Sequence, residues 1–189
     1  MNKEEVLAMT KTDSHRRNRT VTWTQPIIDA EAISRMSGLE LLRAVKDGRT
    51  PPPPVWSLVD LRLVEIDEGR AIFEIHFAEY HYSRFGKVQG GIECPALDAA
   101  TGYAVHSTLP AGVGYTTLEL KVNYVRPITS ETGLMRCLGS VIHRGHRVAV
   151  AEAKMLDCKG LLYAHAIATC LILEPVGEEP CGRTVVSPE

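Results

Sequence analysis

The stretch VQGGIECPALDAAT, residues 88–101, places an acid among small apolar residues shortly after a pair of glycines. Asp is a poor residue for a helix interior and is seldom buried without a partner, yet the neighbours of Asp98 predict a dry setting. A carboxylate in such a setting can attack an electrophilic carbon or take a proton from water. The alternative is a surface Asp on the exposed side of a helix, or one capped by a neighbouring Thr.

Helical spacing places Cys94, Thr101 and Gly102 on the same face as Asp98. The Thr101 hydroxyl is therefore a candidate for orienting the carboxylate, and Gly102 would leave room for part of a substrate. Glu93 lies five residues before Asp98, about 140° away around the helix. We expect Glu93 to be exposed or ion-paired rather than to act as a second catalytic carboxylate.

Gly90 and Gly91 stand at the start of the predicted helix, where backbone N–H groups have no intrahelical acceptor. The helix dipole adds a positive end there, and glycine lets a substrate approach the backbone closely. Because an attacked carbonyl becomes an oxyanion, these amides, Gly90 first, are candidates to stabilise that charge. Taken alone, two glycines before a helix ordinarily mean a turn. Pro95 leaves a second possibility, since a helix that begins near Cys94 would move the free amides away from Gly90.

The elements that must position these residues follow from hydrophobic periodicity. Apolar residues at every third position predict one amphipathic helix over residues 29–46, and the prolines at 51–54 predict an extended connector. Residues 90–109, rich in Ala and Gly, predict the helix that carries Asp98. Alternating apolar and polar residues predict strands over residues 58–64, 70–77, 115–124, 134–143, 146–157 and 161–173.

Short turns between neighbouring strands favour antiparallel pairing. A single helix of small residues has a thin waist, around which a curved sheet can wrap closely. We therefore predict an α+β protein with the hotdog fold: a curved antiparallel sheet of about six strands around a central helix, with an extra N-terminal helix. We expect a tail at residues 1–28, the helix and connector at 29–54, the hotdog domain at 55–174 and a second tail at 175–189.

Several blocks of this sequence are similar to a known family. GKVQGGIECPALDAATGYAVHS, TTLELKVNYVRPI and HRGHRVAVAEAKMLDCKGLLYAHAIATCLIL, with SGLELLRAVKDG upstream, resemble the phenylacetic-acid-degradation type of acyl-CoA thioesterase. This type is one branch of the 4-hydroxybenzoyl-CoA thioesterase superfamily. The likeness runs from about Gly38 to Leu173, with the blocks in the family's order.

The resemblance implies hydrolysis of a small or aromatic acyl-CoA. The family's first glycine and its carboxylate eight residues later match Gly90 and Asp98, which would polarise the carbonyl and act as nucleophile or general base. The resemblance also implies dimers or dimers of dimers, with sites across the dimer interface. Coenzyme A would enter as part of the substrate, with no separate cofactor.

Two positions depart from the family's pattern. Gln89 stands where the family usually has His, and Ser83 stands three residues before the loop glycine, Gly86, where Asn is frequent. We expect Gln89, Gly91 and Thr101 to belong to the catalytic group, and Ser83, Gly86 and Val88 to border the substrate. The departures leave open a non-catalytic acyl-CoA-binding protein, whereas hydratase chemistry lacks the His expected near the carboxylate.

Basic residues are the natural partners of the phosphates of coenzyme A. Arg126, at a strand end, and the turn HRGHR over residues 143–147 supply such charges. We expect Arg126, Arg144, Gly145 and Arg147 to bind this part of the substrate, although surface strands commonly end in Arg. The aromatic residues Trp56, Phe85 and Tyr124 are candidates for the core or for an acyl pocket, and we expect the core. The loop residue His81 could border the substrate, but we expect it on the loop surface.

Composition narrows the remaining classes. A chain of 189 residues with 44% hydrophobic content can bury one full core, and a formal net charge of −2 gives no indication of a nucleic-acid partner. No apolar run approaches the roughly 18 residues that span a bilayer, and no signal peptide is evident, so we expect a cytoplasmic protein. Five cysteines without C-x-x-C spacing and scattered histidines indicate neither a disulfide framework nor a metal site.

Overall fold

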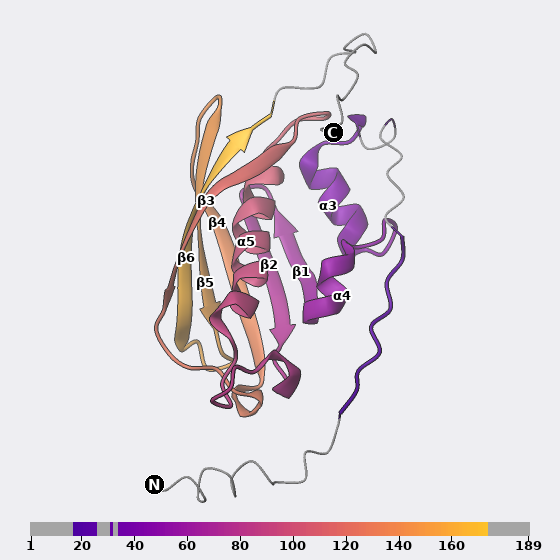
Figure 1. The fold of residues 1–189 in the computed structure, drawn as a ribbon. Helices are drawn as coiled ribbons and strands as arrows, with labels where there is room; N and C mark the ends of the chain where they lie inside the picture. The colour runs from indigo at the N-terminus through magenta and orange to yellow at the C-terminus, as the bar shows by residue number, and fades with distance from the viewer. Residues whose placement is uncertain (1–16, 26–30, 32–33, 174–189) are drawn as a thin grey trace, which may run out of the picture.

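The computed structural model describes residues 17–25, 31 and 34–173, so most of the two predicted tails lies outside it. Within these ranges, six antiparallel strands form one sheet in the order β1-β2-β4-β5-β6-β3, and the long helix α5 (Gly90–His106) lies against one face of the sheet (Figure 1). The strands are β1 (Leu61–Asp67), β2 (Arg70–His76), β3 (Tyr115–Tyr124), β4 (Leu134–Arg144), β5 (Val148–Leu156) and β6 (Leu162–Ile172). This arrangement confirms the predicted hotdog fold.

The topology leaves β3 at one edge of the sheet and β1 at the other. β3 pairs antiparallel with β6, from Tyr115 opposite Ile172 to Tyr124 opposite Ala164. The turn between β1 and β2 uses Gly69 at a φ of 74°, a left-handed conformation that favours glycine. The strand predicted over residues 115–124 is confirmed, with the same first and last residues.

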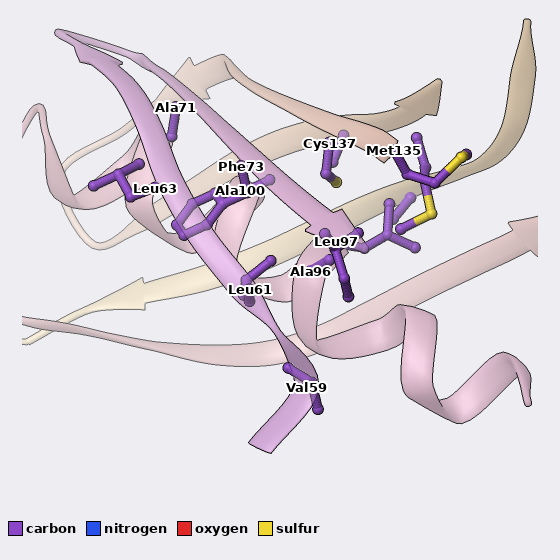
Figure 2. Close-up of a cluster of buried hydrophobic side chains, with 14 of the residues drawn as sticks. Val59, Leu61, Leu63, Ala71, Phe73, Ala96, Leu97, Ala100, Met135 and Cys137 are labelled. Carbon is purple, nitrogen blue, oxygen red and sulfur yellow. The ribbon is translucent and has the colours of Figure 1, made fainter. Parts of the chain in front are cut away.

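Small residues let α5 lie unusually close to the sheet. A Cβ atom at Gly139 of β4 would overlap the backbone carbonyl of Ala100, so the helix rests directly on this glycine. The buried faces of β5 and β6 are also lined by alanines, including Ala151 and Ala166. Larger side chains, such as Phe73 and Leu97, fill the space to either side (Figure 2). The helix of small residues predicted from the composition thus packs on a sheet face that is itself lined by Gly and Ala.

The N-terminal helix differs from its prediction. Helix α3 covers Gly38–Lys46, so one continuous helix over residues 29–46 is wrong, although part of that range lies outside the described residues. The reason is a capping box at Ser37: its hydroxyl accepts from the Glu40 N–H, and the Glu40 carboxylate accepts from the Ser37 N–H at 2.8 Å. This pairing of Ser with Glu three residues later starts a new helix.

The proline connector also ends earlier than predicted. Pro54 is the first residue of helix α4 (Pro54–Val59), because proline is well suited to a first helical position where no N–H is needed. The strand expected from Leu58 therefore begins only at Leu61, after Asp60 has ended the helix at a φ of 56°. Helices α3 and α4 lie beside β1 in Figure 1. No helix in the described ranges combines the length and hydropathy that crossing a membrane would need.

Part of the basic N-terminal segment is held against the fold. The Arg19 guanidinium donates to the carbonyls of Ser57 and Leu58 at the end of α4, forms an ion pair with Asp60 and lies 4.2 Å from the centre of the Tyr80 ring. These contacts satisfy carbonyls at a helix C-terminus, where a cation is favourable. Residues around Arg19 therefore lie against the fold.

Candidate active site

One stripe of α5 faces the edge strand β3. Gly90, Cys94, Asp98 and Gly102 recur every four residues, so they lie above one another on the same side of the helix. Gly90 and Cys94 contact Tyr124, Asp98 contacts Thr117, and Gly102 contacts Tyr115, all on β3. The helix therefore runs antiparallel to β3, and the predicted candidate acid lies on the face of α5 that borders the edge of the sheet.

Asp98 is half-buried and has a hydrogen-bond partner that the sequence interpretation missed. The Thr117 hydroxyl donates to Asp98 Oδ1 at 3.0 Å. The Thr101 hydroxyl instead donates to the backbone carbonyls of Leu97 and Asp98, each at 3.0 Å, and its side chain is fully buried. Thr117, rather than Thr101, thus orients the carboxylate, which excludes the alternative of an Asp on the open side of the helix.

The helix begins at Gly90, not near Cys94, so the two glycine amides stand at its N-terminus. Gln89 is the N-cap residue, and its exposed side chain provides no cap hydrogen bond. Within the described chain, the N–H of Gln89 donates to the His81 carbonyl and the N–H of Ile92 to the Gln89 carbonyl, whereas the N–H groups of Gly90 and Gly91 find no protein acceptor. These two amides are available to an oxyanion.

Two tyrosines of β3 occupy the space that side chains at Gly90 and Gly102 would fill. A Cβ at Gly90 would lie 2.9 Å from the Tyr124 ring, and the Tyr124 hydroxyl donates to the Gly90 carbonyl at 2.9 Å and lies 3.2 Å from Cys94 Sγ. A Cβ at Gly102 would lie 2.8 Å from the ring of Tyr115. The space that we expected Gly102 to leave for a substrate is therefore filled by a side chain of the protein.

The aromatic hydroxyls near Asp98 stay protonated. Burial, with a smaller contribution from the Asp98 charge, raises the pKa of Tyr103 to about 12. Burial and the charges of Tyr103 and Asp98 likewise raise the pKa of Tyr115 far above its ordinary value. Neutral phenols on this side of α5 are hydrogen-bonding groups rather than bases at physiological pH.

The loop before the glycines is a small hairpin. Tyr82 and Val88 form an antiparallel bridge, and within it the Ser83 N–H donates to the Lys87 carbonyl at 2.7 Å. Gly86 closes the turn at a φ of 68°. Val88 is buried and its N–H donates to the Ile128 carbonyl at 2.9 Å. Ser83, Gly86 and Val88 therefore fix the path of the chain into Gly90.

The aromatic residues and His81 divide differently from their predictions. Trp56 is in the core as expected. Phe85, at the hairpin turn, is 83% exposed and Tyr124 is 50% exposed, so the expectation that these two lie in the core is wrong. His81 is buried rather than on the loop surface, and its Nδ1 accepts from the Ala78 N–H at 3.1 Å. Burial lowers the pKa of His81.

The basic residues fall into two places. Arg144, Gly145 and Arg147 line a cavity of about 460 Å³ at the end of the sheet where α5 terminates, whose other walls include Ile172. Arg126 follows β3 at the opposite end and donates to the Leu162 carbonyl. One chain thus brings three of the four predicted residues together, but not beside Arg126 or the Gly90 amide.

Glu93 contradicts its prediction. It is 4% exposed, and its Oε2 atom has no hydrogen-bond partner in the described chain, so it is neither exposed nor ion-paired. Burial raises the pKa of the Glu93 carboxyl to about 7. The helical angle correctly separated Glu93 from the Asp98 stripe, but that angle turned it towards the interior of the protein.

Comparison with known proteins identifies the family. The family model of the thioesterase superfamily matches residues 85–164, which include the hairpin turn, the glycines, α5 and β3 to β5. A protein of Saccharolobus solfataricus, provisionally named an esterase, is 30% identical over 132 residues, which are 70% of this chain and 92% of that protein.

Solved structures share the fold. One from Ralstonia eutropha, provisionally named a thioesterase related to phenylacetic acid degradation, is 27% identical with a TM-score of 0.63 over 68% of this chain and 97% of that chain. The PaaI protein from the Escherichia coli phenylacetic acid degradation operon has a TM-score of 0.64 at 15% identity, over 74% and 95% of the two chains. The chain therefore belongs to the thioesterase superfamily, with the hotdog fold of its phenylacetic-acid-degradation branch, and is a hydrolase.

Proposed function

We propose that the protein hydrolyses the thioester of a small or aromatic acyl-CoA. The Gly90 amide polarises the thioester carbonyl, and Asp98 acts as nucleophile or as general base for water. The observation that carries this proposal is the Asp98 carboxylate, half-buried and held by Thr117, on the α5 stripe that starts at the free glycine amides. Coenzyme A is part of the substrate, and hydrolysis requires no further cofactor.

Helix geometry supports a site made by two copies of the chain. Gly90 and Asp98 are eight residues apart on α5, about 12 Å along the helix axis. A carbonyl under attack must lie about 3 Å from both the oxyanion donor and the nucleophile. Direct attack by Asp98 on a carbonyl held by Gly90 of the same chain is therefore too distant, whereas two antiparallel α5 helices can bring Gly90 of one copy beside Asp98 of the other.

The edge strand offers the surface for such a dimer. Within the described residues β3 pairs with a strand on one side only, and Leu118 on β3 is 59% exposed. A long unpaired edge with apolar side chains is a template for another strand. Antiparallel pairing of two β3 strands about a two-fold axis sets their α5 helices antiparallel as well, with the Asp98 stripes next to the axis.

The same two-fold pairing explains how the separated basic residues can serve one substrate. It places the Tyr124 end of one β3 beside the Tyr115 end of the second. Because Tyr115 lies opposite Ile172, which lines the basic cavity, the Arg144–Arg147 turn of the second copy approaches the end of the molecule that carries Gly90 and Arg126. Phosphates of coenzyme A would bind there, where both copies supply guanidinium groups.

A thiol-release assay tests this function. Purified protein would be given short, long and aromatic acyl-CoA esters, together with the same acyl groups on N-acetylcysteamine, which lacks the nucleotide. We expect turnover of small or aromatic acyl-CoA esters and a higher KM for the truncated thiol. Tight binding of acyl-CoA without thiol release across the panel would contradict hydrolysis and favour a binding protein. An equal KM for both carriers would contradict the role of the basic residues.

A further inference from the structure

Glu93 is a buried carboxyl group whose Oε2 atom finds no hydrogen-bond partner among the residues that the structure describes. Its side chain is 4% exposed, Oε2 is buried without a hydrogen bond, and the described residues form no ion pair with it. A buried polar group without a hydrogen bond lowers the stability of the fold by roughly 1 to 3 kcal/mol. Such a group therefore points to a partner from outside the folded chain. A bound ligand could supply the acceptor or donor that hydrogen-bonds to Glu93.

The position of Glu93 relates it to the candidate oxyanion site. It is the fourth residue of α5, one turn beyond Gly90. Side chains on a helix tilt towards its N-terminus and cover the preceding turn, so the Glu93 carboxyl lies near the level of the free Gly90 amide. Its charge also contributes to the raised pKa of Tyr124, the residue whose hydroxyl contacts the Gly90 carbonyl.

The surroundings favour the neutral form of this carboxyl below about pH 7. Burial alone raises the pKa of Glu93 to about 7, with no contribution from a cation. The Glu93 charge acts on the Tyr124 hydroxyl of β3, which in turn lies 3.2 Å from Cys94 Sγ on α5. A protonated carboxyl has an O–H donor, which an ionised one lacks. The first turn of α5 therefore holds two kinds of unused donor: the glycine amides and the Glu93 O–H.

We propose that neutral Glu93 donates a hydrogen bond to the thioester carbonyl oxygen held by the Gly90 amide, as a second donor of the oxyanion site. This inference rests on the proposed function, because the hydrogen-bond acceptor of Glu93 is the carbonyl oxygen of the thioester substrate. As the attacking oxygen forms its bond to the carbonyl carbon, the π electrons move to the carbonyl oxygen, and the Glu93 hydrogen bond strengthens while its proton stays on Glu93.

The intermediate then collapses: the carbonyl re-forms, the C–S bond breaks, and the thiolate leaves. Where water attacks, Asp98 takes the proton of the water and returns it to the thiolate. Where Asp98 itself attacks, solvent protonates the thiolate, and water then hydrolyses the resulting anhydride to free the acid and regenerate the carboxylate. Ionised Glu93 would reverse this effect, because a negative carboxylate at the same level as the oxyanion repels it. The neutral form is therefore the active one, and kcat/KM, which reports the ionisation of the free enzyme, should fall as the pH rises through about 7.

The test compares full-length wild-type protein with Glu93→Gln and Glu93→Met. Gln keeps an N–H donor of nearly the same shape but cannot ionise, and Met keeps the length without a donor. The exposed Glu68, on the turn between β1 and β2, gives the matched control Glu68→Gln. Steady-state thiol release would be measured from pH 5.5 to 8.5 with the best acyl-CoA of the panel, with circular dichroism to confirm folding.

We expect kcat/KM of the wild type and of Glu68→Gln to fall about tenfold between pH 6 and pH 8. Glu93→Gln should stay within about tenfold of the wild type at pH 6 and lose the falling limb, and Glu93→Met should lose about 10²-fold in kcat. An unchanged falling limb in Glu93→Gln, or wild-type kcat in Glu93→Met, would overturn the role of Glu93 while leaving that of Asp98 intact. Absence of thiol release by the wild type would overturn both.

Discussion

The Thr117 hydroxyl donates a 3.0 Å hydrogen bond to the Asp98 carboxylate, joining the edge strand β3 to the middle of α5. The two residues are on different elements, so the bond depends on the antiparallel alignment of the helix with β3. A carboxylate held in one rotamer is ready to attack or to orient water, without the loss of rotational freedom that a free side chain would incur. The edge of the sheet thereby becomes part of the site.

Thr117→Val should lower kcat about tenfold with little change in KM, because the isosteric side chain leaves Asp98 in place but unfixed. Thr117→Ser should restore most of the rate, since it keeps the hydroxyl. The exposed neighbour Thr116 provides the control, and Thr116→Val should match the wild type. Steady-state kinetics on the four proteins would check this. A wild-type kcat in Thr117→Val would contradict an orienting role for the hydroxyl.

A site shared between two copies can be tested by complementation. Gly90→Pro removes the candidate oxyanion N–H at a first helical position, and Asp98→Asn removes the carboxylate. Because a Cβ at Gly90 would lie 2.9 Å from the Tyr124 ring, circular dichroism would first confirm that Gly90→Pro folds. Each variant alone should be nearly inactive. A statistical mixture of the two, formed by co-expression, should recover about a quarter of wild-type activity, because half the dimers are mixed and each mixed dimer has one intact site.

The same mixture distinguishes a site contained in one chain from a site shared between two copies. If Gly90 and Asp98 of one copy served the same carbonyl, no mixed dimer would contain an intact site. Activity of the mixture equal to the sum of the two separate variants, with mixed dimers shown by mass spectrometry, would contradict the shared site.

The close approach of α5 to the sheet predicts an unusual sensitivity at Gly139. Gly139→Ala places a methyl group in the position of the Ala100 carbonyl, so the helix must shift, and we expect a loss of about 2 to 3 kcal/mol in the free energy of unfolding. Ser140→Ala, next on the same strand, should change it by less than about 1 kcal/mol. Urea unfolding measures both, and equal midpoints for Gly139→Ala and the wild type would show that the helix has room to move.

Burial of Glu93 predicts a pH-dependent contribution to stability. The unfolded chain releases this proton near the ordinary value of 4.5, whereas the folded chain holds it to about pH 7, so the folded state binds more protons in this window. Stability should therefore fall as the pH rises from about 4.5 to 7. Relative to the wild type, Glu93→Gln should gain about 3 kcal/mol at pH 8 compared with pH 4. Parallel stability curves for the two proteins would contradict the raised pKa.

The fold could be predicted well from the sequence because its main signals are local. Alternation over residues 134–143 marks a strand with a buried inner face, and alternation over residues 115–124 marks an edge strand with a half-buried inner face. The Ala-rich helix fits only a closely wrapped sheet. The start of α3 was missed although it also has a local signal, the Ser37–Glu40 capping box. Proline was read as excluding a helix at Pro54, where it in fact begins one.

The candidate site was less predictable because it depends on contacts distant in sequence. Helical spacing placed Asp98 with Cys94 and Gly102, but the strand that faces this stripe, and hence Thr117, follows only from the sheet order. Rotation around α5 separated Glu93 from Asp98 correctly, yet it could not tell solvent from a buried side. The distance of about 12 Å along the helix axis between Gly90 and Asp98 is the one feature of the site that the sequence does predict, since it follows from the rise per residue of a helix.

The most direct test of the proposed mechanism is the rate of thiol release by Asp98→Asn and Asp98→Ala with the acyl-CoA that the wild type hydrolyses best. If Asp98 attacks the carbonyl or activates water, both variants should lose about 10³-fold or more in kcat, with Asp98→Asn the less affected, while acyl-CoA binding and the oligomeric state remain those of the wild type. Wild-type kcat in purified, correctly folded Asp98→Ala would contradict the account.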